Sequence, residues 1–356
     1  MEGGQTNVVE AVVSTRDASV YGRAMIADAH VDLLMELAYR ERRLGETDVF
    51  ASTWLPLLEQ GDVGLQVCPV YVDVVVQPEG ALREALSLVA SFHRALAENP
   101  GRVVGVATAS DLDPVAAGER IGLLLALEGV ECFGVETWPA DVFHALGVRM
   151  AGLTWNRRNA FADGAAEDGG GLSRLGRELV DRLVSLGVIL DLAHASHGVY
   201  AEVLERAGGA PVLCSHGACR SVYDTPRNLD DDQLRALADA GGVLGLMLHP
   251  IAIGPERRTI DGVVDHLEHA VSVMGADRVC LGGDFTTRLW EAMPPPPEPK
   301  DGLMPPGLTP GLGIEGLTGS EQYPALVEKL RVRGWREEEV AAVTGGNLLR
   351  FLRASL

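Results

Sequence analysis

The sequence predicts an α/β protein built as a (β/α)8, TIM-type barrel. Short apolar segments alternate with amphipathic helical stretches along the whole chain, which is the pattern of repeated βα units around a parallel sheet. Polar side chains able to bind metal end or closely follow several of these apolar segments. Because the carboxyl ends of parallel barrel strands form one face, these side chains are expected to meet there.

Eight apolar segments have the length and composition of buried strands. They are residues 25–34, 64–72, 122–130, 148–155, 188–195, 211–218, 242–248 and 278–285. Eight such strands in sequence favour a closed barrel over an open doubly wound sheet. No GxGxxG or Walker motif follows the first segment, so a dinucleotide-binding or nucleotide-binding sheet is disfavoured.

Amphipathic segments between the strands carry apolar residues at spacings of three and four. The clearest are residues 81–97, 173–186, 230–240 and 261–274. We therefore expect a single domain over residues 1–356, with its core between about residues 25 and 355.

A Pro- and Gly-rich stretch, residues 294–319, interrupts the alternation of strands and helices after the eighth strand. Its composition excludes a helix, and long loops of this kind on a barrel are often functional. We expect it to lie over the catalytic face, as a lid or as an interface loop.

The composition indicates which kinds of partner the protein binds and in which cellular compartment it is expected. The formal net charge is -20 and the pI is about 4.8, which disfavours nucleic acid and anionic membranes because phosphates are repelled. The five cysteines are odd in number and form no CxxC pair, so we expect reduced core residues. No apolar signal-peptide region is visible in the first two dozen residues, and a cytoplasmic protein with a small-molecule substrate is predicted.

Six ionisable residues lie at matching ends of five strands. They are His30, Asp32, Glu128, His194, His216 and Asp284. A single histidine at a strand end is usually a hydrogen-bonded structural residue, but burying six ionisable groups together is costly unless metals or catalysis offset the cost. Imidazole and carboxylate ligands suit zinc, so the barrel is predicted to be of the metal-dependent hydrolase kind.

Two neighbouring metal ions need a bridging anion. The only lysines, Lys300 and Lys329, lie outside the predicted strands, which excludes a carboxylated lysine and leaves Glu128 as the candidate bridge. The period-two spacing of His30 and Asp32 predicts that both side chains leave the same face of a strand and reach one ion.

Three further residues lie near the predicted site. Arg227, in the run YDTPRNLDD beyond the sixth strand, is able to pair with a substrate carboxylate or to act as a structural loop clamp. His197 falls at the start of a predicted helix, where a metal ligand is not expected. His249 follows the seventh strand and belongs to the catalytic rim.

Several sequence blocks together resemble the membrane (renal) dipeptidase family of zinc peptidases, family M19. The blocks run in order from about residue 25 to 355 and read DAHVDLL, LALEG, LTWNRRNAFADG, GLSRLGRELVDRLVSLGVILDLAHAS, PVLCSHGACRSVYDTPRNLDDDQL, LGGDF and GGNLLRFL. A match of several ordered blocks is far more specific than any single motif.

The resemblance implies a barrel that binds two zinc ions per chain and hydrolyses dipeptides through a hydroxide that bridges the ions. His30 and Asp32 are implied to hold one ion and His194 and His216 the other. Glu128 is implied to bridge the two. The same resemblance implies that Asp284 acts as the acid/base, that Arg227 holds the substrate carboxylate, and that a homodimer is possible.

Two positions depart from the family pattern. The family's LTH block has Trp155 in place of the histidine that contacts the substrate carbonyl, and DFDG is replaced by DF followed by Thr286 and Thr287. An indole donates one hydrogen bond but carries no positive charge. The alternative is therefore a related binuclear hydrolase acting on another amide, a lactone or a modified amino acid. A metal-binding protein without catalysis is a third reading.

Overall fold

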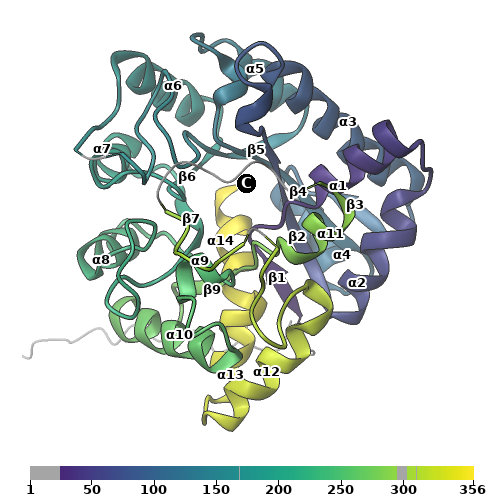
Figure 1. Cartoon of the computed structure of the whole chain (residues 1–356), viewed down its shortest axis with the longest axis vertical. Helices are drawn as coiled ribbons and strands as arrows, with labels where there is room; N and C mark the ends of the chain where they lie inside the picture. Colours follow the sequence, from purple (N-terminus) through teal and green to yellow (C-terminus); the bar gives the residue numbers. More distant parts are fainter. Residues whose placement is uncertain (1–24, 168, 295–302, 310) are drawn as a thin grey trace, which may run out of the picture.

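Parallel strands form one sheet in the computed structural model, which describes residues 25–167, 169–294, 303–309 and 311–356. The strand order is β2-β1-β9-β8-β7-β6-β5-β4-β3, and an additional β2–β4 pairing closes the ring (Figure 1). The strands are β1 (Ile26–Asp28), β2 (Val63–Tyr71), β3 (Val103–Gly105), β4 (Ile121–Glu128), β5 (Val148–Gly152), β6 (Ile189–Asp191), β7 (Val212–Gly217), β8 (Leu244–Met247) and β9 (Val279–Gly282).

The predicted (β/α)8 barrel is confirmed. Each of the eight predicted apolar segments overlaps one strand of the closed ring, and β2 and β4 begin one residue before the predicted segments. The additional strand, β3, pairs only with the first residues of β4 and lies outside the ring. Because β3 is only three residues long, it lacks an apolar run that would have distinguished it from a loop.

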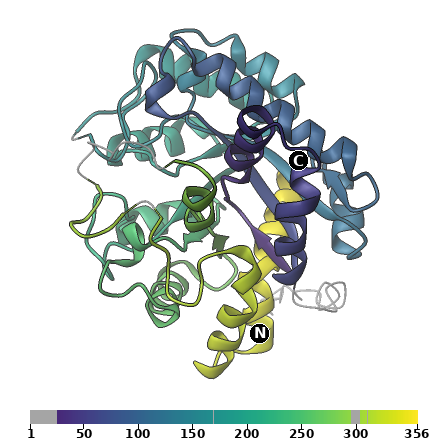
Figure 2. The same cartoon turned by 45° about the vertical axis from the view of Figure 1, so that its right-hand side comes forward.

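Helices surround the ring of strands, as the two views in Figures 1 and 2 show. They are α1 (Leu33–Tyr39), α2 (Leu55–Gln60), α3 (Ala81–Glu98), α4 (Asp113–Ala116), α5 (Pro139–Ala145), α6 (Arg174–Ser185), α7 (His197–Ala207), α8 (Asp231–Asp239), α9 (Pro250–Ile253), α10 (Ile260–Met274), α11 (Thr287–Ala292), α12 (Tyr323–Val332), α13 (Glu337–Ala341) and α14 (Asn347–Ser355). The four amphipathic segments named from the sequence correspond to α3, α6, α8 and α10. Within the described ranges, no helix has the length and apolar character needed to cross a membrane.

The inside of the barrel is filled by small and branched apolar side chains that pack together with α14. Members of this inner cluster include Ala27, Leu65, Val67, Leu124, Ala126, Met150, Ile189, Leu213 and Cys280, with Leu348, Leu349 and Leu352 from α14. Just before α14, Gly345 lies against the carbonyl of Met25, where β1 begins. The C-terminal helix therefore closes the amino-terminal end of the barrel and leaves the opposite face for a site.

The segment after α11 packs part of its chain into the main core. Leu303, Ile314 and Leu317 are buried there, and Gly313 lies against the side chain of Thr287 in α11. Residues 295–302 and 310 of the predicted covering loop lie outside the described residues, so its place over the catalytic face stays a prediction.

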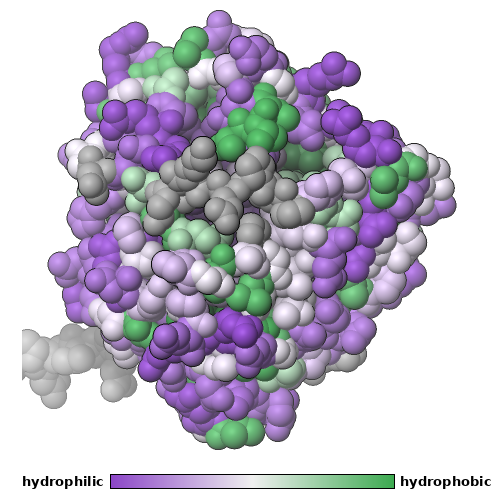
Figure 3. All heavy atoms as spheres, in the orientation of Figure 1, coloured by the Kyte–Doolittle hydropathy of each residue, from purple (hydrophilic) through white to green (hydrophobic). Residues whose placement is uncertain are grey.

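Among its described residues, the face of the molecule shown in Figure 3 has no large apolar patch that would indicate an interface between subunits. Hydrophilic residues cover most of the face in Figure 3, and hydrophobic ones form small separate groups. Large exposed apolar side chains include Val75, Val135 and Val332, and scattered residues of this kind are normal on a globular protein. The possible homodimer therefore stays a prediction.

Glycines let strands β7, β8 and β9 approach closely beside the site. A Cβ added at Gly282 would overlap the carbonyl oxygen of Ser215. We expect Gly282→Ala to lower the free energy of unfolding by about 1–3 kcal/mol, because the backbone of β7 must shift. Chemical denaturation measures the change. Gly101→Ala is the control because no atom lies within 4 Å of its Cβ position, and equal stability of the two variants would contradict this packing.

Candidate metal centre

The first two predicted ligands lie in the turn between β1 and α1. β1 ends at Asp28, His30 follows in the turn, and Asp32 is the N-cap residue of α1. The prediction that His30 and Asp32 leave one face of a strand is therefore wrong, since neither belongs to the strand. The turn still brings them together: His30 Nε2 lies 4.0 Å from Asp32 Oδ2.

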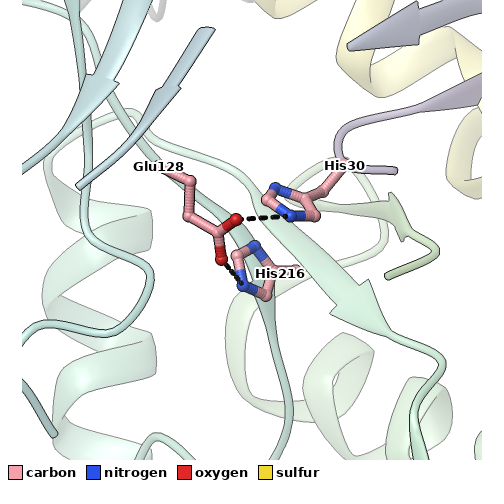
Figure 4. A group of neighbouring side chains, drawn as sticks. All are labelled: His30, Glu128 and His216. Carbon is pink, nitrogen blue, oxygen red and sulfur yellow. Dashed lines mark ion pairs between the residues drawn. The ribbon is translucent and has the colours of Figure 1, made fainter. Parts of the chain in front are cut away.

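Glu128, the last residue of β4, directs its two carboxylate oxygens at two neighbouring histidines, His30 and His216, whose ring centroids lie 3.8 Å apart (Figure 4). Its Oε2 is 3.5 Å from His30 Nε2. Its Oε1 is 2.9 Å from His194 Nε2 and 3.7 Å from His216 Nε2. One carboxylate therefore faces the imidazole in the turn after β1 with one oxygen and the imidazoles beyond β6 and in β7 with the other, which is the arrangement a bridging ligand requires.

Two groups of side chains in the described residues have ligand atoms within 4.8 Å of one another. One group contains His30, Glu128 and His216, and the other contains His30, Asp32 and Asp284. His194 adjoins the first group, with its Nε2 2.7 Å from that of His216. The six residues predicted at the strand ends thus come together, with His30 common to both groups.

The polar atoms of the cluster fit a metal ion. His30 Nε2, Asp32 Oδ1 and Glu128 Oε2 are buried and have no hydrogen-bond partner within the described parts of the chain. Leaving such atoms without a partner in the interior costs free energy. A divalent cation would satisfy these atoms together, and imidazole and carboxylate are ligands that zinc accepts.

Neighbouring side chains orient two of the imidazoles. His194 Nδ1 lies 2.7 Å from Asn156 Oδ1, and His216 Nδ1 lies 2.9 Å from Ser215 Oγ. An amide oxygen only accepts, so it favours the His194 tautomer with the proton on Nδ1. The Nε2 lone pair of that tautomer faces Glu128, as in metal sites whose ligand histidines donate their other N–H to a neighbour.

Burial makes the charged forms of the site residues unfavourable when no cation is bound. It raises the pKa of Asp32, Glu128 and Asp284 to about 8 in each case. It also lowers the pKa of His194 and His216 well below the usual range, with nearby cationic groups adding to the effect. The cluster therefore favours neutral carboxyls and neutral imidazoles until a positive ion compensates.

Arg227 and Trp155 border this cluster. The buried Arg227 side chain donates from Nη2 to the carbonyl of His216 over 2.9 Å, and its Nε has no hydrogen-bond partner in the described part of the chain. Burial lowers the pKa of Arg227. The Trp155 ring lies 5.5 Å from that of Tyr71 and 6.0 Å from that of His194, measured between ring centroids. Both predicted substrate-binding residues thus lie beside the ligands.

His197 and His249, the two further histidines named from the sequence, occupy the different positions expected of them. His197 is the first residue of α7, and its exposed ring lies 3.6 Å from Asp230 rather than in the cluster. His249 is the N-cap residue of α9 and approaches Thr286 Oγ1 with Nε2 at 3.0 Å, two positions beyond Asp284.

Sequence reasoning missed the side chains that support the ligands. Asn156 and Ser215 were not identified as site residues, although Asn156 directly follows Trp155 and Ser215 directly precedes His216 in the chain. Their adjacency to predicted site residues within the quoted blocks was the available signal. Polar residues are common beside such motifs, so adjacency alone did not show which of them contact a ligand.

The closed barrel and its buried His/Glu cluster define a metallohydrolase-type protein. The model of the membrane dipeptidase family, peptidase family M19, matches residues 15–292 and 308–355. The chain therefore belongs to this family of metallopeptidases, and its enzyme class is that of the dipeptidases.

Relatives named as dipeptidases match along most of the chain. Dipeptidase aclJ of Aspergillus oryzae is 27% identical over 94% of this chain and 78% of its own length. Dipeptidase verJ of Clonostachys rogersoniana is 30% identical over 85% of this chain and 75% of its own length. Human dipeptidase 3 is 29% identical over 92% of this chain, but the match spans only 64% of the human protein.

Solved structures show the same fold. A metallopeptidase from Rhodobacter sphaeroides, liganded with a phosphinate mimic of the dipeptide L-Ala-D-Ala, superposes with a TM-score of 0.80 at 22% identity, covering 93% of this chain and 99% of that one. The probable dipeptidase PvdM from Pseudomonas aeruginosa gives 0.77 at 19% identity, covering 95% and 97%. At these identities, the likeness concerns the architecture.

The raised carboxyl pKa values predict that metal binding releases protons. Carboxyls with a pKa of about 8 hold their protons at about pH 7, and a metal ion must displace them. Zinc binding to the metal-free protein should therefore release protons at about pH 7, and the apparent affinity should rise as the pH is raised through about 8. Calorimetry in buffers of different ionisation enthalpy measures the release. Asp284→Asn should release fewer protons, and binding without proton release at about pH 7 would contradict the expectation.

Proposed function

We propose that the protein is a dipeptidase that holds two zinc ions and hydrolyses the peptide bond of small dipeptides. Membership of the M19 family supports this proposal, and one structural observation carries it. Glu128 presents one carboxylate oxygen to His30 and the other to His194 and His216, while carboxylate oxygens of Asp32 and Asp284 lie 4.0 and 3.9 Å from His30 Nε2.

The ligand assignment is the one that the family resemblance implies, and these positions are compatible with it. His30 and Asp32 would hold one ion, His194 and His216 the other, and Glu128 would contact both. Bound divalent ions supply Lewis-acid polarisation of the scissile carbonyl and an attacking water of lowered pKa. The protein's own part is to fix the ligands, exclude bulk water and move protons.

Asp284 is the proposed proton carrier. Its carboxylate lies 3.9 Å from His30 Nε2, and burial raises its pKa to about 8. Burial favours the protonated carboxyl and bound cations would favour the carboxylate, so the two effects oppose each other in the metal-loaded site and a proton can be exchanged in either direction. Asp284 would take the proton of the attacking water and then deliver it to the leaving amine.

Arg227 is the proposed anchor for the substrate. A small dipeptide carries a free C-terminal carboxylate, and a buried guanidinium pairs with such a group through two parallel hydrogen bonds. The Nη2 bond to the His216 carbonyl holds Arg227 beside the metal ligands, while its Nε is without a hydrogen-bond partner among the described residues. A carboxylate bound there would lie next to the predicted ions.

Trp155 favours a second candidate function on the same scaffold. Its ring packs between Tyr71 and His194, where the family pattern places a histidine. An indole cannot supply a positive charge to a developing oxyanion. A related binuclear hydrolase acting on another amide, a lactone or a modified amino acid is therefore the alternative.

Two substitutions separate the proposed roles of Asp284 and Arg227. Asp284→Asn should lower kcat by about 100-fold or more with little change in KM, because the proton carrier is lost. Arg227→Lys should mainly raise KM, because the charge remains but the paired hydrogen bonds do not. Steady-state kinetics on a dipeptide and on its C-terminal amide test this, since the amide should be insensitive to Arg227→Lys. The same fall in kcat and the same rise in KM in both variants would contradict these roles.

Trp155→His separates the two candidate functions. If dipeptides are the substrates and Trp155 is merely tolerated, the wild-type protein should hydrolyse a panel of L,L and L,D dipeptides at ordinary enzyme rates. If the substrate is of another class, the wild type should leave the panel intact and Trp155→His should gain about 100-fold in dipeptide hydrolysis over its background. A panel left intact by both proteins, each loaded with zinc, would contradict dipeptidase activity.

A further inference from the structure

Two buried aspartates occupy equivalent positions at the ends of two barrel strands. Asp28 is the last residue of β1 and Asp191 is the last residue of β6. Both are buried, and neither belongs to the predicted ligand set. In the sheet, Asp28 pairs with Leu281 of β9 and Asp191 pairs with Leu213 of β7.

Each aspartate uses one oxygen to bind two backbone amides in the same pattern. Asp28 Oδ1 accepts from the amides of His30 and Gly283, at 3.0 and 2.8 Å. Asp191 Oδ1 accepts from the amides of Ala193 and Ser215, at 3.0 and 2.9 Å. One amide lies two residues ahead, in the turn after the same strand, and the other lies in or directly after the neighbouring strand.

The amides on the neighbouring strands directly precede predicted site residues. Gly283 precedes Asp284, and Ser215 precedes His216. A Cβ at Gly283 would lie 2.8 Å from Asp28 Oδ2, so glycine at this position lets the carboxylate approach the backbone. Each aspartate thus ties the turn after its own strand to the residue just before a site residue on the adjacent strand.

The backbone at the site needs such support. Of the non-glycine residues with positive φ in the described chain, two belong to the predicted site: His194, at 62°, and Asp284, at 48°. Left-handed backbone is unfavourable for these residue types and persists only where the surroundings hold it. His194 follows Ala193, and Asp284 follows Gly283, so each strained residue comes directly after an amide that one of the two aspartates binds.

We propose that Asp28 and Asp191 are positioning residues that fix the two halves of the metal centre independently, Asp28 through His30 and Asp284, and Asp191 through His194 and His216. The proposal rests on the proposed metal site. Hydrogen bonds to backbone amides are directional, and outer groups that orient ligands set metal affinity. Tyr323 adds to the first half, because its hydroxyl donates to Asp28 Oδ2 at 2.6 Å.

The test is a titration of the metal-free protein with Co²⁺, whose absorption bands report the geometry of its ligands. The wild type should take up two ions. Asp28→Ala and Asp191→Ala should each weaken one ion by about tenfold or more and change its bands, leaving the other ion near wild-type affinity. The double variant should weaken both. Asp28→Asn and Asp191→Asn keep Oδ1 as an acceptor and should stay within about threefold of the wild type.

Asp111 provides a matched control. Its Oδ2 also accepts from two backbone amides, those of Ala107 and Thr108, in a segment whose Leu112 packs with α14 away from the ligands. Asp111→Ala should lower stability without changing Co²⁺ affinity. Where an alanine variant does not fold, Asp28→Ser or Asp191→Ser replaces it, because a hydroxyl keeps a bond within the turn but does not reach the adjacent strand.

The outcomes distinguish this inference from the proposed function. A wild-type protein that takes up no Co²⁺ overturns the metal site and the inference with it. A wild type that takes up two ions, with folded alanine or serine variants binding both as tightly, overturns the positioning role alone. Asparagine variants that bind Co²⁺ as weakly as the alanine variants would also overturn it. The effect would then come from the loss of the negative charge and not from the loss of the hydrogen bonds that place the amides.

Discussion

The structure is organised around the cost of burying ionisable side chains at one end of a barrel. Asp32, Glu128 and Asp284 are shielded from water so well that their pKa values rise to about 8. Such a cluster is unfavourable by itself and becomes favourable with cations between its members. The ring of parallel strands makes the convergence possible, because residues far apart in sequence end at the same face.

One end of the barrel is packed for stability, and the other carries the residues of the proposed metal site. At the amino-terminal end, α14 packs Leu348, Leu349 and Leu352 against the inner apolar layer. At the other end, the strands stop early and short turns carry the ligands, with His194 and Asp284 in left-handed backbone. Buried carboxylates at the ends of β1 and β6 accept hydrogen bonds from backbone amides in or directly after the neighbouring strands. The left-handed backbone at His194 and Asp284 is thus held in place by nearby polar contacts.

The sequence predicted the barrel because each strand of the ring falls in an apolar run, even where the strand itself is short. It predicted the ligands because ionisable residues at the ends of several apolar runs are rare unless they form a common site. Exact strand ends were less predictable: the segment 25–34 contains a three-residue strand, a turn and the start of α1, since the apolar pattern continues through all three. Supporting residues such as Asn156 and Asp191 were missed, because a hydrogen bond across neighbouring strands leaves no periodic signal in the chain.

The two-metal centre is tested most directly by the rate of dipeptide hydrolysis as zinc is added stepwise to the metal-free protein. Turnover should be absent without metal and should rise until about two zinc ions are bound per chain, because the two oxygens of Glu128 face different ligand histidines. Turnover in the absence of metal, or full activity at one ion per chain, would contradict a two-metal centre.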